Sequence, residues 1–462
     1  MVRNKLLMNK FLKFIKFSEL TYWTAKRYFI TDLKLTNKYP QVLFGKFLAK
    51  YSSKIINIED EKVYKIIGVR SYGKGAYINR EVQGQNLNMK KYQLVEPNLL
   101  LWCKVDTKNG AFGIVTENLV PSYASSNMAL AKINNNLIAN DYLQLLFTCP
   151  QFHKYLDLFV SGTTNRKYIK IDELLTKIKI PLPLLEKQKE IVDRYNEKIK
   201  LAEEQAKEAQ NLEEMIEQYI CSELKIVNTS PKVSNEFKIS FVNYKDLSRW
   251  GVEFLKNNLS SKDFLKSLVY PMKKLGTLVA INPDNDFSKL DENLEMTFLP
   301  MASISDKFGE IVNAEKGKNE DSNGYTKFKE GDLLWAKITP CMQNGKSAIA
   351  KNLINNRGYG STEFYVIRNK NENELYFDYI YHLLRTKIIR ETATKYFTGS
   401  SGQQRVPKSF LENLSIPLPD FYKQKQISDE LYKIKHKIKE LTYTAEQNRQ
   451  LAQEEFEKEL FE

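Results

Sequence analysis

Ile180-Pro181-Leu182-Pro183 runs directly into a long polar segment, and the same four residues return as Ile416-Pro417-Leu418-Pro419. Behind each copy comes Lys-Gln-Lys-x-Ile, at residues 187–191 and 423–427. At this constant offset of 236 residues, nine of the fourteen positions from 180 to 193 are identical to their counterparts. Solenoid repeats recur about every 20–50 residues. The longer period therefore indicates a duplicated domain, each copy ending in one long helix.

Shorter sequence matches, in the same order in both copies, extend the duplication to the residues that precede each motif. They pair Tyr39-Pro40 with Tyr270-Pro271, Gly45 with Gly276, residues 100–104 with 333–337, and Asn109-Gly110 with Asn344-Gly345. The offset drifts between these pairs, as it does when loops gain and lose residues around a common scaffold. Two copies of one fold with different loops are expected to bind two different targets.

The globular parts show short apolar runs that are typical of a mixed α/β fold. Residues 63–67 and 99–103 are candidate strands, and residues 142–147 and 152–159 are candidate short helices. Between the two strands lies a basic and aromatic loop, residues 70–77, which is either a DNA-reading loop or a plain hairpin turn. Its glycines, Gly73 and Gly75, permit close approach of a backbone to DNA.

Each polar segment after the repeated motif has apolar residues at steps of three and four, which is typical of a coiled-coil seam about four heptads long. The first seam contains Ile191, Tyr195, Ile199, Ala202, Ala206, Ala209, Leu212, Ile216 and Tyr219. The second contains Ile427, Leu431, Ile434, Ile438, Leu441, Ala445, Asn448 and Leu451. We expect the two helices to pair with each other; the alternative is that each packs only on its own domain.

The charge distribution separates the helices from the rest. The chain of 462 residues has a net charge of +14 and a pI near 9.2. Residues 186–224 contain 6 basic and 11 acidic side chains, and residues 423–462 contain 8 and 9, so everything else carries +20. This indicates a nucleic-acid partner for the globular domains, against the alternative of a merely Lys-rich protein.

Candidate DNA contacts are the basic, aromatic and amide side chains of loop-like segments. In the first copy they are Arg70, Tyr72, Lys74, Arg80 and Arg166, and in the second Lys346, Arg357, Tyr359, Gln403 and Arg405. For each charged member the alternative is an ordinary solvated surface charge.

Motifs for catalysis or metal binding are incomplete. Asn344-Gly345-Lys346-Ser347 imitates the end of a P-loop, but Pro340 replaces its first glycine. The four cysteines form no CxxC pair, which argues against a zinc ribbon and fits a reducing cytoplasm. No run of 18 or so apolar residues predicts a membrane span. We expect neither catalytic nor metal-binding residues in this chain.

The combined pattern resembles the specificity (S) subunit of type I restriction-modification systems, a component of phage defence. The resemblance covers essentially the whole chain. It is carried by the segments from Ser161-Gly162 to Ile191 and from Gly399–Arg405 to Ile427, and by Gly360-Ser361-Thr362-Glu363-Phe364. The first copy departs from the last pattern, having Ser125-Ser126-Asn127-Met128 there.

The resemblance implies a fold of two similar α/β target-recognition domains separated by two long antiparallel coiled-coil helices with pseudo-two-fold symmetry. The expected boundaries are domain 1 at 1–180, the central helix at 181–227, domain 2 at 228–415 and the C-terminal helix at 416–462. Each domain would read one half of a bipartite, asymmetric site in double-stranded DNA.

The resemblance also implies a cytoplasmic, non-catalytic subunit. Two methyltransferase (M) subunits, and two restriction (R) subunits where present, would dock on it and carry S-adenosylmethionine, ATP and Mg, none of which this chain binds. Two other functions stay open: a two-headed DNA-binding regulator or architectural protein without a methyltransferase partner, and a free-standing nuclease or methyltransferase. No linear motif in the sequence gives the DNA target or its spacer length, because base contacts are made by loop side chains.

Overall fold

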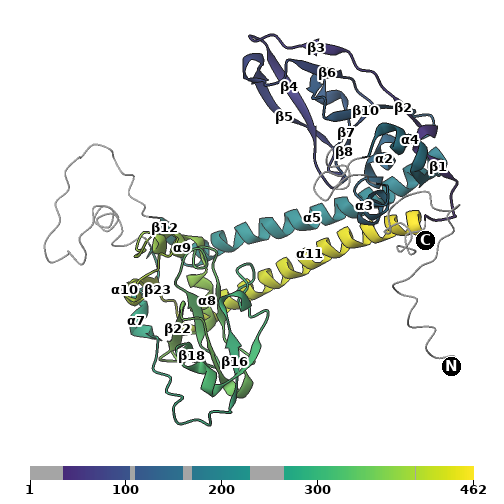
Figure 1. Cartoon of the computed structure of the whole chain (residues 1–462). Helices are drawn as coiled ribbons and strands as arrows, with labels where there is room; N and C mark the ends of the chain where they lie inside the picture. Colours follow the sequence, from purple (N-terminus) through teal and green to yellow (C-terminus); the bar gives the residue numbers. More distant parts are fainter. Residues whose placement is uncertain (1–34, 105–109, 160–168, 229–264, 401) are drawn as a thin grey trace, which may run out of the picture. The chain divides into compact units, whose positions relative to one another are not determined.

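The computed structural model describes residues 35–104, 110–159, 169–228, 265–400 and 402–462 (Figure 1). Their contacts form two compact units. Unit 1 takes the chain up to Glu204 together with Thr444–Glu462, and unit 2 is Gln205–Tyr443. Each unit therefore contains one globular domain and a part of each of two long helices. These helices are α5 (Leu185–Glu223) and α11 (Phe421–Phe461).

The centre of the globular domain in unit 1 is an antiparallel four-stranded sheet of order β2-β10-β7-β8. Its strands are Leu48–Lys50, Met128–Ile133, Leu99–Cys103 and Phe112–Ile114. Side chains of a strand alternate between faces. Leu100 and Trp102 of β7 pack among the short helices, whereas Leu99 and Leu101 pack against a second sheet. A strand with both faces covered explains the continuous apolar run in the sequence.

The second sheet of unit 1 has the order β3-β6-β9-β4-β5. Its strands are Ile55–Asn57, Lys91–Val95, Ser122–Ala124, Val63–Val69 and Ala76–Gln83. β4 and β9 are parallel, and the other neighbours are antiparallel. Three short helices complete the domain: α2 (Asn140–Leu146), α3 (Pro150–Asp157) and α4 (Ile171–Lys177).

Unit 2 repeats both sheets with the same connections. β15-β22-β19-β20 matches the central sheet, with strands Val279–Ile281, Phe364–Asn369, Leu333–Ala336 and Ser347–Ile349. β17-β16-β21-β18 matches the second sheet without a counterpart of β3, with strands Glu315–Lys318, Glu295–Leu299, Arg357–Gly360 and Thr326–Lys329. Its helices are α8 (Phe377–Leu384), α9 (Lys387–Thr394) and α10 (Lys408–Asn413). The predicted duplication of one α/β domain is confirmed.

Each domain is closed by a pair of entry and exit strands. β1 (Gln41–Leu43) pairs with β11 (Lys179–Pro181), and β14 (Met272–Lys274) pairs with β23 (Ser415–Pro417). Just after each entry strand, a Cβ on Gly45 or Gly276 would lie 2.9 or 2.8 Å from a backbone carbonyl oxygen of α4 or α10. The two matching glycines are therefore required by close packing. A short α7 (Leu275–Leu278) and the pair β12 (Ile226–Asn228) and β13 (Leu265–Ser267) complete unit 2.

The long helices pack on each other inside both units. In unit 1 the first part of α5 meets the last part of α11, with Arg194–Glu459 and Lys198–Glu455 ion pairs at 3.0 and 3.1 Å. In unit 2 the last part of α5 meets the first part of α11, where Ala209, Ile438 and Leu441 are buried together. The helices are thus antiparallel, as predicted. One predicted seam position, Leu451, is wrong: it is exposed, and Ala452 is buried instead.

Candidate nucleic-acid interface

A buried glutamine from the repeated Lys-Gln-Lys motif fixes each globular domain to its helix. In unit 1, Gln188 is fully buried and its Oε1 accepts a hydrogen bond from the Ala139 N–H (2.8 Å). Its Nε2 donates to the carbonyl oxygens of Pro183 (2.8 Å) and Leu137 (2.9 Å). The side chain therefore joins the start of α2 to the start of α5.

Unit 2 builds the same anchor with Gln424. Its Oε1 accepts from the Tyr376 N–H (2.9 Å), and its Nε2 donates to the carbonyls of Pro419 (2.8 Å) and Glu374 (3.0 Å). A buried tyrosine hydroxyl adds to each anchor, from Tyr142 to the Pro181 carbonyl (3.0 Å) and from Tyr379 to the Pro417 carbonyl (2.6 Å). The sequence displayed these glutamines within the repeat, but their role was missed because burial cannot be read from a polar motif.

The predicted basic loop of unit 1 is the turn of the β4–β5 hairpin, here named the unit-1 loop (residues 70–75). The Arg70 N–H donates to the Gly75 carbonyl (3.0 Å), and the Arg70 guanidinium lies over the Tyr77 ring at 4.3 Å. Tyr72 is 59% exposed and Lys74 is exposed. Arg80 is also exposed, on β5. Among the described residues, none of these three cations has a carboxylate partner, so all three are free to meet phosphates.

Gly73 of the unit-1 loop does not have the predicted role, because it is buried against its own domain. Gly73 is buried with φ +65°, and a Cβ there would lie 2.1 Å from the Phe147 carbonyl oxygen. Gln144 also donates to the Gly73 carbonyl (2.6 Å). The close approach that Gly73 allows is therefore to α2 of its own domain. Gly75 needs glycine only for its φ of +85°.

Unit 2 contains the counterpart of this hairpin turn, here named the unit-2 loop (residues 305–310), which the sequence did not reveal. The Ser305 N–H donates to the Glu310 carbonyl (2.9 Å), and Gly309 has φ +70°. Tyr381 of α8 donates to the Gly309 carbonyl (3.0 Å), as Gln144 does in unit 1. Phe308 packs against α5 and α11 residues. This loop is attached to the helices.

Two segments that carried the family resemblance meet in unit 2. Arg405 donates from Nε and Nη2 to Glu363, with a shortest distance of 2.7 Å. These hydrogen bonds lower the pKa of the Glu363 carboxyl. Gln403 is exposed beside this pair. The Arg405 side chain is 42% exposed, so it remains a candidate DNA contact. Its ion pair with Glu363 holds it in a fixed orientation.

The other unit-2 candidates lie elsewhere. Lys346 donates from Nζ to the Met301 carbonyl (3.1 Å), and Arg357 donates to the Asn355 carbonyl (3.0 Å) at the start of β21. Arg357 and the Glu363–Arg405 pair are at opposite ends of that strand. The prediction of Tyr359 as a DNA contact is wrong, because its ring is buried against Phe298. A tyrosine in an apolar alternation cannot be told from a surface tyrosine by sequence alone.

The predicted helix residues have two kinds of surroundings. Tyr195, Ile199, Ile216, Ile434 and Ile438 are buried or partly buried on α5 and α11. Ile191 belongs to the core of the unit-1 domain, and Ile427 and Leu431 to that of unit 2. The start of each helix is therefore part of its domain, beyond the pairing that the sequence predicted.

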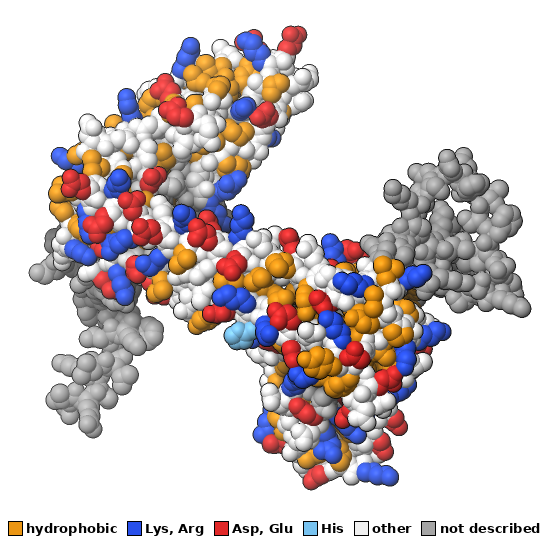
Figure 2. Space-filling model, turned by 180° about the vertical axis from the view of Figure 1, so that it is seen from behind, with side chains coloured by type: hydrophobic (Ala, Val, Ile, Leu, Met, Phe, Trp, Pro, Cys, Tyr) orange, Lys and Arg blue, Asp and Glu red, His pale blue; other side chains and the backbone are white. Residues whose placement is uncertain are grey.

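The positive charge predicted for the globular domains does not form one basic surface on the face that Figure 2 shows. Figure 2 shows Lys and Arg side chains interspersed with Asp and Glu on the visible face. Residues 1–34, 160–168 and 229–264 together carry +10 of the +20 outside the helices. Arg166, Ser161, Gly162 and Asn109 lie outside the described residues. Within the described ranges, no group of His, Cys, Asp and Glu could hold a metal ion, and no helix is long and apolar enough to span a membrane.

Comparison with known proteins gives a consistent result. The family model of the type I restriction modification DNA specificity domain matches residues 46–214 and 270–448. The specificity subunits of the type I restriction enzymes EcoEI and EcoAI from Escherichia coli are each 38% identical over 154 residues, 33% of this chain. These matches span only 25% and 26% of the two relatives.

A solved chain from work on complex assembly and conformational transition of the type I R-M system has a similar fold. It aligns over 92% of this chain and 98% of its own length, with a TM-score of 0.56 and 14% identity. The two family matches cover most of the two globular domains and the first part of the helix that follows each one. The chain belongs to the family of type I restriction modification DNA specificity domain proteins, and it is built from two such domains.

Proposed function

We propose that this chain is the non-catalytic subunit that selects the DNA site of a type I restriction-modification complex. Each globular domain reads one half of a bipartite, asymmetric site, and the helices carry the methyltransferase subunits and any restriction subunits. The observation that carries the proposal is that two copies of one fold have equivalent anchors but different hairpin loops. Gln188 and Gln424 make the same bonds, whereas the unit-1 and unit-2 loops differ in sequence and surroundings.

The chemistry of the described residues supports a binding role. Exposed cations and aromatics such as Arg70, Tyr72 and Lys74 suit phosphate contact and base stacking. Arg405 is oriented by Glu363, so its exposed edge can reach a base or a phosphate with little loss of side-chain entropy. The methyl-transfer and cleavage chemistry would belong to the partner subunits.

Long-read methylome sequencing tests the proposal. A host carrying the partner methyltransferase is sequenced with the wild-type chain, without it, and with a hybrid chain. In the hybrid, residues 270–424, which include the anchor Gln424, come from another member of the family. We expect adenine methylation at a two-part site that vanishes without the chain. With the hybrid, one half-site should change while the other persists. Methylation that is independent of the chain, or failure of the chain to co-purify with a methyltransferase, would favour a regulator instead.

A further inference from the structure

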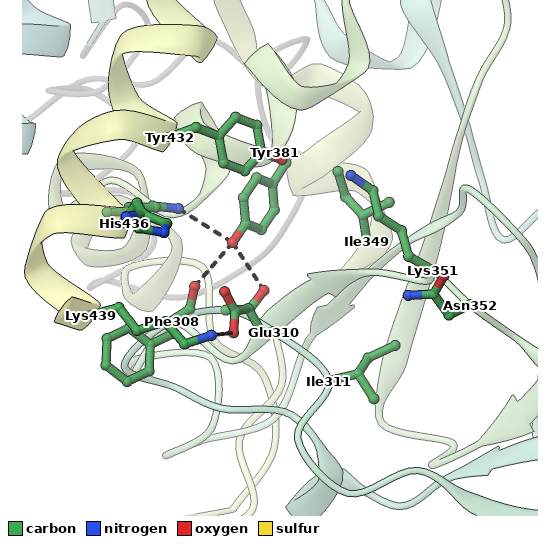
Figure 3. A pocket seen from close by; sticks show the side chains of 12 residues that line it. Phe308, Glu310, Ile311, Ile349, Lys351, Asn352, Tyr381, Tyr432, His436 and Lys439 are labelled. Atoms are coloured by element: carbon green, nitrogen blue, oxygen red, sulfur yellow. Dashed lines mark hydrogen bonds and ion pairs between the residues drawn. The ribbon is translucent and has the colours of Figure 1, made fainter. Parts of the chain in front are cut away.

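Unit 2 contains a pocket of about 470 Å³ between the unit-2 loop, α8 and α11 (Figure 3). A volume of this size suits a small molecule. Its walls include the aromatic rings of Phe308, Tyr381 and Tyr432. Three lysines and a histidine also line it, against one carboxylate, that of Glu310. The pocket is therefore positively charged and is partly lined by apolar rings.

Lys435 is the cation that lacks a counterion. Among the described residues no carboxylate lies within ion-pair distance of its Nζ, and its one hydrogen bond goes to the Tyr381 hydroxyl at 3.3 Å. The ammonium also lies 4.4 Å from the centre of the Tyr381 ring. Burial, and then the nearby Arg385, depress the pKa of Lys435 well below its usual value. An ammonium in such a place is costly unless an anion joins it.

The two carboxylates whose charge acts on Lys435, those of Glu310 and Asp378, already have partners. Glu310 forms an ion pair with Lys439 (2.7 Å), as Figure 3 shows. Asp378 accepts a hydrogen bond from the Tyr432 hydroxyl (2.5 Å) and lies 3.8 Å from Lys351. Neither acid reaches Lys435, which retains donor hydrogens that no described residue accepts.

A buried histidine lies close to the same cations. His382 is 4% exposed, its Nε2 has no hydrogen-bond partner among the described residues, and its ring lies 4.7 Å from that of Tyr432. Burial, and then Lys435, Arg385 and Lys351, lower the pKa of His382 well below its usual value. Arg385 donates to backbone carbonyls such as that of Gly345 (2.5 Å), so its charge is hydrogen-bonded but not neutralised.

We propose that this pocket binds a small phosphate-bearing anion, with the Lys435 ammonium as its principal ligand and Lys351 and His436 at its rim. Phosphate offers three oxygens and up to two charges, which suits an ammonium whose donors are unused and which has further cations beside it. Lys435 is partly buried, so only a group that enters the pocket reaches it. A DNA duplex is too wide to do so.

The site is specific to unit 2. Counting back by the 236-residue offset of the helix motif, the position of Lys435 corresponds to Ile199 in α5. The position of Tyr381, two residues after the anchoring Tyr379, corresponds to Gln144, two residues after Tyr142. Unit 1 therefore lacks both the ammonium and the hydroxyl that orients it.

Equilibrium dialysis of the full-length chain against labelled inorganic phosphate tests the proposal at constant ionic strength. We expect one saturable site per chain in the wild type and at least a tenfold weaker affinity in Lys435→Met. Lys433→Met is the matched control, because it removes the same charge from an exposed position of the same helix and should bind as the wild type does. Absence of saturable binding, or equal binding by Lys435→Met, would overturn the proposal.

Two further measurements separate this pocket from a DNA-binding surface. Phosphate should remain bound when the chain is saturated with a DNA duplex, and displacement by the duplex would overturn the proposal. Phosphate should also raise the pKa of the His382 imidazole, observed by NMR, because it adds negative charge to the field around that ring. An unchanged His382 pKa during saturable binding would place the ion elsewhere and contradict the proposal.

Discussion

The two hairpin loops occupy the same position in two copies of one fold, yet they have different surroundings. The unit-1 loop exposes Arg70, Tyr72 and Lys74. In the unit-2 loop, Phe308 packs among helix residues and Glu310 forms an ion pair with Lys439 of α11. The hairpin is therefore part of the common scaffold, and only its side chains decide whether it offers a binding surface. Under the proposed function, a hairpin loop that contacts DNA in one copy need not do so in the other.

Shortening the two long helices should have the largest effect on the methylated site. The deletion leaves both hairpin loops intact, so it tests the helices alone. Removing residues 201–207 and 446–452, one heptad from each helix, shortens each helix by about 10 Å at roughly 1.5 Å per residue. If the helices determine the distance between half-sites, the methylated site should keep both half-site sequences. Its spacer should lose about three base pairs, or methylation should cease. Full methylation at the original spacing would show that the helices only carry partner subunits.

Removing an anchor should destabilise one unit and spare the other. Gln424→Ala leaves the Tyr376 N–H and two carbonyls without their partner in a dry site, at a cost of about 3 kcal/mol. Hydrogen exchange should then accelerate in α8 but not in α2, and Gln188→Ala should do the reverse. Gln426→Ala, at an exposed position of the same helix, is the control and should change neither. Acceleration in both units by one substitution would contradict the independence of the anchors.

The stability of unit 1 should depend on pH through the Glu459 carboxylate, which joins α11 to α5 and to the globular domain. Burial raises the pKa of Glu459, but hydrogen bonds from Tyr39, Lys38 and Arg194 outweigh it and lower the pKa to about 2. A carboxyl group whose pKa is lower in the folded state stabilises the fold at any pH above its unfolded pKa, which is about 4.3 for Glu. This contribution is lost as the pH falls toward the folded pKa of about 2. We expect Glu459→Gln to cost about 2 kcal/mol at neutral pH.

The difference between wild type and Glu459→Gln in the free energy of unfolding should shrink between pH 5 and pH 2 or so. Glu455→Gln, at a more exposed ion pair of the same helix, is the control and should have a small effect at every pH. A difference that stays constant with pH would show that Glu459 acts through packing alone.

The smallest effect is expected at the unit-1 loop itself. Arg70→Ala with Lys74→Ala should weaken DNA binding by the assembled complex and reduce the slope of log affinity against log salt by about 2, since each lost phosphate contact removes about one counterion. The paired experiment is Lys307→Ala in the unit-2 loop, which should leave the slope unchanged. Equal effects of the substitutions in the two loops would show that the loops do not differ in DNA contact. An affinity that does not depend on salt would contradict phosphate contact by either loop.

The sequence predicted the architecture well because the duplicated motif and the helix seams are local patterns. The strand at 99–103 and the helices near 142 and 152 also agree with β7, α2 and α3. Site residues were harder to predict because contacts between distant segments decide them. Tyr359 is buried by Phe298, Arg405 is held by Glu363, and Gly73 packs on Phe147. None of these partners is adjacent in sequence, and no alignment of two copies with different loops could reveal the unit-2 loop.

The pairing of entry and exit strands has a consequence for the exchange of domains between proteins. Because Gln41 lies opposite Pro181 and Met272 opposite Pro417, each globular domain begins and ends at one place and behaves as an insertion into a helical frame. A transplant cut at the prolines would separate Gln188 or Gln424 from the carbonyls that it binds. Functional chimaeras should therefore join within the helix, after the glutamine, so that each domain travels with its own anchor.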